Sequence, residues 1–387
     1  MRVDASACMS LQLLTPAYQH YGVNAELPSP GEAREISGMT NYSLRAMGLA
    51  LASVQLFALG ALPARAGSLL LYPLNFVVGQ QQSLANDIND SGQVAAQYRD
   101  ASGNFHAVIW KNGAVTNINI GYTAFATRIN AQGATIGPYL QTCCKGSWNA
   151  FVYDPVTQLT RTISEHAGYG TFPNGINSSG VIVGDNEGKG SSPILNGWED
   201  NNTLTKSVNV KNALSTNPTT INAAGTIGGW YFDAASVRHG FTRAGTKTTI
   251  IDPPGATITF LANIADDGTV VGSYSDAASH YHGFSEIGGV YTLVNYPGSA
   301  KTFLNDNSAS GEAVGLWGEI SGATHGLIWV GGAYYSFDYP GSTYTAIEGV
   351  NTGGSIVGWY LDAGGVAHGF VGLCATGDAP CTSGHVG

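Results

Sequence analysis

Five histidines each follow an acid by six residues, and this is the spacing in the chain with the most obvious potential for chemistry. The pairs are Asp100 and His106, Asp233 and His239, Asp276 and His282, Glu319 and His325, and Asp362 and His368. A histidine beside a carboxylate can act as an acid–base pair or supply two ligands to a metal ion. The same two side chains can instead join the strands of one hairpin. Because an active site is normally built once, whereas a structural contact is needed in every repeat, we favour the structural interpretation.

These histidines belong to a repeat whose clearest marker is an apolar residue followed by Asn-x-x-Gly. The marker residues are Asn89 and Gly92, Asn130 and Gly133, Asn177 and Gly180, Asn222 and Gly225, Gly268 after Ala265, Asn307 and Gly311 with the apolar position lost, and Asn351 and Gly354. The seven glycines are 41 to 47 residues apart. An Asn side chain can accept a hydrogen bond from the backbone two residues on, and Gly supplies a positive φ, so each marker predicts a hairpin turn.

Each unit contains two further blocks that predict more strands. His-Gly-Phe or a variant of it recurs, as at 239–241, 282–284 and 368–370, and an apolar run ends in a Pro-Gly turn, as at 252–255 and 338–341. Together the blocks predict four short strands in each unit. A four-stranded unit repeated about every 43 residues is typical of a β-propeller blade. We therefore predict an all-β fold: a seven-bladed β-propeller with four-stranded blades over residues 67–373.

The two ends of the repeat region complement each other. After His368–Val371 the last unit lacks a fourth strand, and the chain continues only as a tail over residues 374–387. Before the first marker lies an unassigned apolar run, residues 69–76. We expect this N-terminal strand to complete the last blade and close the propeller, which also removes an open sheet edge.

The His-Gly-Phe and Asn-x-x-Gly blocks resemble those of the HAF-repeat family of bacterial extracellular proteins. The resemblance covers residues 84–373 and is strongest in repeats four to seven. Repeat two has Asn149 in place of the histidine, and repeat three has no His-Gly-Phe at all. The resemblance implies an exported repeat protein. It transfers no catalytic residue, because the motif is a structural consensus.

The N-terminal region has the features of a secretion signal. From Met39 the chain carries one cation, Arg45, then an uncharged run over residues 47–62 and a small-x-small site ending at Ala66. We interpret residues 39–66 as a signal peptide and residues 1–38 as a mispredicted extension ahead of the true start. A short membrane anchor or a buried helix is the alternative. The expected location is secreted, either extracellular or periplasmic, with no stable membrane insertion after cleavage.

The cysteine count fits an exported chain. Removal of Cys8 with the leader leaves four cysteines, an even number that permits pairing. Cys374 and Cys381 enclose a short loop, and we expect a disulfide between them. Cys143 and Cys144 are adjacent, and a strained vicinal disulfide and two free thiols both remain open for them.

Known catalytic and metal-binding motifs do not occur in the sequence. It contains no G-x-S-x-G, no H-E-x-x-H and no phosphate-binding loop. The segment 87–92 faintly resembles a calcium loop, but Tyr98 stands where the required glutamate would be. We therefore assign no catalytic residue, no cofactor and no metal. The acid or amide of the Pro-Gly turns, at Asp252, Asn295 and Asp338, fits either a sugar-binding rim or plain turns, and we favour turns.

Composition limits the partners. The chain has 387 residues, 53 of them Gly, only 11% charged residues and a formal net charge of -10. The acid excess argues against nucleic acid and anionic membranes as partners. The leading hypothesis is a secreted, non-catalytic and monomeric protein that binds an extracellular protein or polysaccharide through rim loops or the channel mouth, or that serves in adhesion. The alternative is an exported lyase or hydrolase whose site lies in the channel, with residues 142–145 and 187–190 as its expected place.

Overall fold

The computed structural model describes residues 67–142, 147–163, 170–187, 195–374 and 381–386. The described residues belong to one compact unit, Ala66–Gly387. The expected extension and signal peptide, Cys143 and Cys144 lie outside the described residues. The described residues form strands and turns without a helix, which confirms the all-β prediction.

Three repeats each form a separate antiparallel sheet of four strands. Repeat one consists of β2 (Gln82–Ile88), β3 (Val94–Arg99), β4 (Phe105–Lys111) and β5 (Ala114–Asn117). Repeat three consists of β11 (Gly170–Ile176), β12 (Ile182–Glu187), β13 (Leu195–Asp200) and β14 (Thr205–Ser207). Repeat four consists of β15 (Ser215–Ile221), β16 (Ile227–Phe232), β17 (Arg238–Ala244) and β18 (Lys247–Ile251).

The last three repeats share one 13-stranded sheet. Repeat five consists of β19 (Ile258–Ile264), β20 (Val270–Ser275), β21 (Tyr281–Ile287) and β22 (Val290–Val294). Repeat six consists of β23 (Lys301–Asn307), β24 (Glu312–Gly318), β25 (Thr324–Val330) and β26 (Ala333–Phe337). Repeat seven consists of β27 (Tyr344–Val350), β28 (Ile356–Leu361) and β29 (Ala367–Cys374), next to β1 (Gly67–Pro73). Single parallel bridges, Tyr281 to Lys301 and Thr324 to Tyr344, connect the three units, so each remains a four-stranded unit within the sheet.

Repeat two departs from the expected four strands because its first strand is interrupted. Its sheet contains β6 (Thr123–Ala124), β7 (Arg128–Ile129), β8 (Thr135–Leu140), β9 (Asn149–Asp154) and β10 (Leu159–Ile163), with β6 and β7 both pairing with β8. The Phe125 N–H donates to the carbonyl of Pro138 at 3.1 Å. Pro138 has no N–H with which to return the bond, so the ladder breaks between β6 and β7.

The N-terminal strand lies against the last repeat. β1 pairs antiparallel with β29, from Leu69 opposite Cys374 to Pro73 opposite Phe370. The side chains of Leu69, Leu71 and Leu74 are 0%, 1% and 1% exposed. β1 therefore occupies the fourth-strand place that the sequence left empty in repeat seven.

The C-terminal residues differ from the expected tail. Strand β30 (Cys381–Val386) pairs in parallel with the other edge of β1. The disulfide between Cys374 and Cys381 confirms the expected pair, with the two Cα atoms 5.8 Å apart. Because this bond returns the chain toward β1, the residues after it add a further strand to the sheet.

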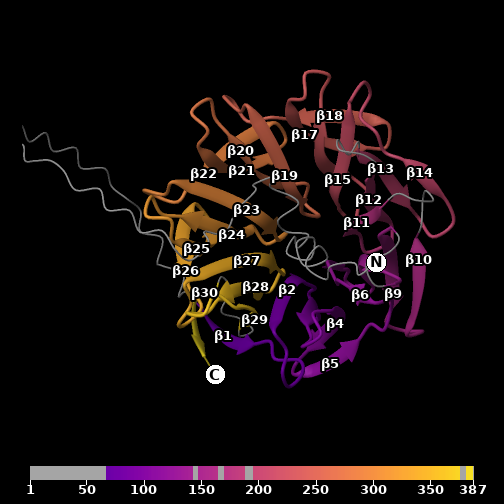
Figure 1. Cartoon of the computed structure of the whole chain (residues 1–387). Coiled ribbons are helices and arrows are strands. Elements are labelled where there is room, and N and C mark those ends of the chain that lie inside the picture. The colour runs from indigo at the N-terminus through magenta and orange to yellow at the C-terminus, as the bar shows by residue number, and fades with distance from the viewer. Residues whose placement is uncertain (1–66, 143–146, 164–169, 188–194, 375–380, 387) are drawn as a thin grey trace, which may run out of the picture. The chain divides into compact units, whose positions relative to one another are not determined.

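The apolar core lies between neighbouring sheets. One cluster joins Val271 and Val294 of repeat five to Leu304 and Leu327 of repeat six. Another joins repeat seven to repeat one, with Val357 and Val371 packed among side chains that include Ala85 and Val94. The first strands, such as β11, β15 and β19, lie nearer the common centre than outer strands such as β14, β18 and β22 (Figure 1).

A β-bulge recurs at the same place in the first strand of six repeats. The register shifts between Ala85 and Asp87, Pro173 and Gly175, Pro218 and Thr220, Leu261 and Asn263, Leu304 and Asp306, and Ile347 and Gly349. A bulge bends its strand and redirects the side chains beside it. The bulges thus set the direction of the residues just before each marker turn.

We expect the buried leucines of β1 to carry much of the stability. Replacing Leu71, which is 1% exposed, by Ala should lower the free energy of unfolding by about 2–5 kcal/mol through lost burial and a cavity. Val78→Ala is the matched control, because Val78 is fully exposed, and should change stability by less than about 0.5 kcal/mol. Denaturant unfolding measures both. Removal of residues 68–78 should lower the Tm sharply, and an unchanged Tm would contradict the role of β1.

Candidate functional site at the mouth of the central channel

All five histidines lie beside the acids that precede them. The histidine Nε2 lies close to a carboxylate oxygen in every pair. The distance is 2.9 Å for His106 and Asp100, 3.4 Å for His239 and Asp233, 3.1 Å for His282 and Asp276, 3.5 Å for His325 and Glu319, and 3.0 Å for His368 and Asp362. Each pair lies within one repeat, across the hairpin between its second and third strands. The geometry agrees with the structural interpretation of the series.

Each of these histidines also stacks on an aromatic ring of the neighbouring strand. Ring centroids are 4.9 Å apart for Tyr98 and His106, 5.3 Å for Tyr231 and His239, 5.0 Å for Tyr274 and His282, 4.4 Å for Trp317 and His325, and 5.3 Å for Tyr360 and His368. In repeats six and seven the other partner of that aromatic is a tyrosine from the preceding Pro-Gly turn: Tyr296 lies 4.0 Å from Trp317 and Tyr339 lies 3.9 Å from Tyr360. The imidazole thus ends a stack that joins two repeats.

The polar residues of the Pro-Gly turns are part of the same assembly. A carboxylate oxygen of Asp252 is 2.6 Å from Nδ1 of His239, and one of Asp338 is 2.9 Å from Nδ1 of His325. In repeat five the amide of Asn295 lies 2.9 Å from Nδ1 of His282. These side chains orient the histidines of their own repeats, which favours the turn interpretation over a sugar-binding rim.

The marker glycines adopt the left-handed conformation that the turns require, with φ between 72° and 93° in all seven. Each marker asparagine has two functions. The Asn89 oxygen accepts from the N–H groups of Ser91 and Gln93, at 3.1 and 3.0 Å, and so holds its own turn. Its amide nitrogen donates to the Asn130 carbonyl of the next repeat at 2.9 Å.

The donation to the next repeat continues along the series. The amide of Asn130 donates to the carbonyl of Asn177, that of Asn177 to Asn222, that of Asn222 to Ala265 and that of Asn351 to Asn89. Asn307, which the sequence predicted as the marker of repeat six, does not make this donation to the next repeat. Ser308 occupies the marker position of repeat six, because it is the Ser308 carbonyl that accepts from the Gly311 N–H. The turn of repeat six has one more residue between Asn307 and Gly311 than the other turns have, so the sequence pattern placed its marker one position too early.

The turn end of the sheets surrounds a cavity of about 220 Å³ that is lined by all seven repeats. The residues two positions before the marker position differ strongly between repeats: Asp87, Arg128, Gly175, Thr220, Asn263, Asp306 and Gly349. All of them except Gly349 line the cavity. At these equivalent positions three repeats therefore carry charged side chains, Asp306, Asp87 and Arg128, whereas the other repeats have Gly, Thr or Asn.

The two aspartates are held by neighbouring repeats. Asp87 accepts from the Ile129 N–H of repeat two at 2.9 Å. Asp306 accepts from the Val350 N–H of repeat seven at 2.9 Å and from the amide of Asn263 at 2.5 Å. Repeat seven is bonded to both repeat six and repeat one, and its equivalent residue is Gly349, which has no side chain.

Burial perturbs these carboxyl groups. It raises the pKa of Asp306 to about 7, with the charge of Asp87 acting in the same direction and that of Arg128 opposing it. Burial also raises the pKa of Asp87, against the effect of Arg128 and of the N–H groups that bind it. Desolvation favours the protonated acid, and a neighbouring like charge adds to this effect. The raised pKa values of Asp87 and Asp306 set these two positions apart from the equivalent positions of the other repeats.

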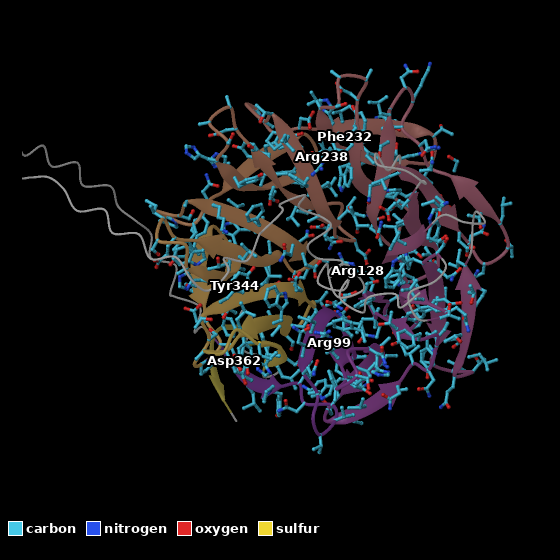
Figure 2. All side chains as sticks on the ribbon, in the orientation of Figure 1. Arg99, Arg128, Phe232, Arg238, Tyr344 and Asp362 are labelled. Atoms are coloured by element: carbon cyan, nitrogen blue, oxygen red, sulfur yellow. A yellow bond between two sulfur atoms is a disulfide. The ribbon has the colours of Figure 1, made fainter. Side chains whose placement is uncertain are left out.

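Arg128 and Glu348 complete the charged group. Arg128, on β7, donates from Nε to the carbonyl of Asn174 at 3.3 Å (Figure 2). Its charge acts on Glu348, Asp87 and Asp306, yet no carboxylate in the described part of the chain lies within 4 Å of it. Glu348 accepts from the indole N–H of Trp359 at 2.9 Å, and burial raises its pKa.

Sequence reasoning missed this cluster. A comparison of equivalent positions two residues before each marker would have shown that two acids and an arginine break the repeat there. The expected place for a specialised site, residues 142–145 and 187–190, lies largely outside the described residues. Among the residues that the structure describes, no group of three His, Cys, Asp or Glu side chains is arranged to hold a metal ion.

Comparison with known proteins identifies the fold. No family model matches the chain, and no curated protein matches it. The β-propeller domain of the trilobed protease from Pyrococcus furiosus is 12% identical over 75% of this chain and 95% of its own, with a TM-score of 0.49. The acylaminoacyl peptidase of Pyrococcus horikoshii is 10% identical over 76% of this chain, with a TM-score of 0.51. This chain spans about half of that enzyme, 52% of its length.

These likenesses extend to the fold alone. Four-stranded antiparallel units placed around a common centre are the architecture of a β-propeller. In the part of the chain that the structure describes, no helix is long and apolar enough to cross a membrane. The chain has a β-propeller fold, and its activity must be argued from its own residues.

A second buried acid, outside the channel cluster, gives a testable pH dependence. Asp185 is 4% exposed and accepts from the amides of Asn174 and Asn217 at 2.8 and 3.1 Å. Burial raises its pKa from 3.8 to about 7. Between these two values the folded state keeps a proton that the unfolded state has lost, so the free energy of unfolding falls as pH rises from about 4 to 7.

Asp185→Asn removes this titration while keeping an acceptor for both amides. The variant should match the wild type near pH 4 and become more stable than it by on the order of 2–4 kcal/mol at pH 8, because the wild type then carries a buried charge. Urea unfolding at both pH values measures the difference. Asp267→Asn, in an exposed turn, is the control for loss of a charge in water. An Asp185→Asn difference that does not grow with pH would contradict the assignment.

Proposed function

We propose that this chain is an exported, non-catalytic binding protein, built as a closed seven-bladed propeller, that takes its ligand at the channel mouth. The observation that carries the proposal is the group Asp87, Arg128 and Asp306, which breaks the repeat where the seven units meet. Structural positions in a repeat protein tend to be alike in every unit. Charges that occur in only three units point to a role outside the common framework.

Closure of the propeller is supported from two sides. The amide of Asn351 in repeat seven donates to the carbonyl of Asn89 in repeat one at 3.1 Å, and the Thr352 N–H donates to Asp90 at 2.9 Å. At the outer side, β1 pairs with β29. Closure of this kind fixes the geometry of a channel site, because every lining residue has a neighbour on both sides.

The enzyme alternative rests on one specific feature. A carboxyl with a pKa of about 7, such as Asp306, can hold or release a proton at neutral pH, and Asp87 beside it can remain the ionised partner. Such a pair suits an exported lyase or hydrolase. We place binding first because the aspartates already accept from backbone or side-chain N–H groups.

Blocking the channel mouth tests whether ligands bind there. Ala309 is exposed at the cavity mouth, and Ala309→Trp should abolish binding of small polar ligands by placing an indole over the opening. Ile320→Trp is the matched control, because Ile320 is 89% exposed on a hairpin of the second and third strands. A panel of amino acids, polyamines, organic acids and oligosaccharides is screened by thermal shift against both variants.

Ligands that bind the wild type and Ile320→Trp but not Ala309→Trp support a channel site. Equal binding by all three proteins would contradict it, and so would a wild type that binds nothing in the panel. Mass spectrometry of the incubated panel shows turnover, and a converted compound would favour the enzyme.

Export is tested separately by the mature N-terminus. Membership of the HAF-repeat family and a bacterial source would fit a secreted protein that begins near Gly67. Mass spectrometry of protein recovered from the medium or periplasm should therefore find its first residue there. Recovery of peptides from residues 1–38 in the exported form would overturn both the proposed start and the signal peptide.

A further inference from the structure

The charged group at the channel mouth contains both signs without pairing them. Asp87, Asp306 and Arg128 all line the cavity, and in the described residues no ion pair within 4 Å joins Arg128 to either aspartate. A partly buried charge without a partner has lost hydration, and a ligand group of opposite charge can compensate for that loss. We propose that the cavity binds a small zwitterion, a molecule with an ammonium and a carboxylate group such as a free α-amino acid. This inference rests on the proposed channel site and names its ligand class.

The size of the cavity supports a small ligand. Its volume of about 220 Å³ is below the roughly 300–1,000 Å³ of pockets that hold drug-sized molecules. It equals the liquid volume of about seven water molecules, at roughly 30 Å³ each. A single amino acid fits this space, whereas a polysaccharide chain would have to remain outside the mouth.

The acidic side suits an ammonium group. Asp87 and Asp306 each accept from an N–H of the next repeat, which fixes the carboxylates while leaving further lone pairs free. The repeat between them contributes Gly349, and a Cβ there would lie only 3.3 Å from the Cα of Asp87. Burial, and after it the charge of Asp87, raises the pKa of Asp306, and a cation between the two carboxylates would favour their ionised forms.

The basic side suits a carboxylate group. Arg128 uses Nε for the carbonyl of Asn174, and its two terminal nitrogens have no hydrogen-bond partner among the described residues. The planar fork of a guanidinium binds a carboxylate through two parallel hydrogen bonds. Gly175, the equivalent residue of repeat three, also lines the cavity and contributes no side chain or charge to it.

Ligands of one charge sign fit less well. A polyamine would meet Arg128, and a dicarboxylate would meet Asp87 and Asp306. Only a ligand with both charges offers each side of the cavity its partner. The remaining lining, with Thr220 and Asn263 bonded to each other at 2.6 Å, is neutral and polar.

The experiment uses the purified wild-type protein first. The twenty amino acids are screened by thermal shift, and the best binder is compared by calorimetry with its amide, which keeps only the ammonium, and with its deaminated acid, which keeps only the carboxylate. We expect at least one amino acid to bind and both analogues to bind at least tenfold more weakly. If no amino acid binds, or if either analogue binds as tightly as the amino acid, the proposal is wrong.

Two variants test which protein side chain binds each charged end of the ligand. Arg128→Gln should remove the advantage of the amino acid over its amide, and Asp306→Asn should remove the advantage over the deaminated acid. Thr220→Val, an uncharged change at the same level, should keep both advantages. If a ligand of another class binds the channel and is blocked by Ala309→Trp, the zwitterion proposal fails while the proposed function stands.

Discussion

The side-chain amide of the marker asparagine is the contact on which the arrangement of repeats depends. Its oxygen holds the turn of its own repeat and its nitrogen donates to the carbonyl of the next, as for Asn89 and Asn130. One residue therefore couples local turn geometry to the placement of the neighbouring sheet. Leaving a buried carbonyl without this donor would lower the free energy of unfolding by on the order of 1–3 kcal/mol. The same bond between Asn351 and Asn89 joins the last repeat to the first.

Where the marker asparagine is missing, its contact moves into the channel. Repeat five has Ala265 at the marker, and Asn263, two residues earlier, donates to the Asn307 carbonyl of repeat six at 3.3 Å. Repeat six has Ser308, and there Asp306 accepts from the Val350 N–H of repeat seven. The polar character of the channel is thus partly a consequence of how these repeats are joined. Asp87 and Arg128 lie in repeats that keep their asparagine, yet they too contact the next repeat: Asp87 accepts from the Ile129 N–H and Arg128 donates to the Asn174 carbonyl.

Much of the fold follows from local sequence chemistry. Turn residues at fixed intervals predicted the strands, the turns at Gly92 and its equivalents, and the place of β1, because each depends on backbone preference and on the count of strands per repeat. The His–acid pairs were predictable for the same reason, since six residues span one hairpin. The disulfide between Cys374 and Cys381 required only a short loop.

The channel cluster could not be predicted in this way, because it depends on side-chain direction. In six repeats a one-residue bulge before the marker sets the side-chain direction, as at Asn86 and Asp87, and the bulge has no distinctive residue type in this chain. The charged side chains also come from repeats one, two and six, which are far apart in the sequence and line one cavity in the structure. The shift from Asn307 to Ser308 has a similar origin, since an added residue in a turn changes the register without changing the composition.

The way the acids are held also bears on what they can do. General acid–base catalysis needs a carboxyl that can reach the substrate and change its proton partner during the reaction. Asp306 is 6% exposed and is fixed by the Val350 N–H and the Asn263 amide, which come from the repeats on either side of it. Movement of this carboxylate would break contacts that join three repeats. A carboxylate held so firmly is better suited to recognising a charge than to transferring a proton, and this favours a binding site at the channel mouth over a catalytic one.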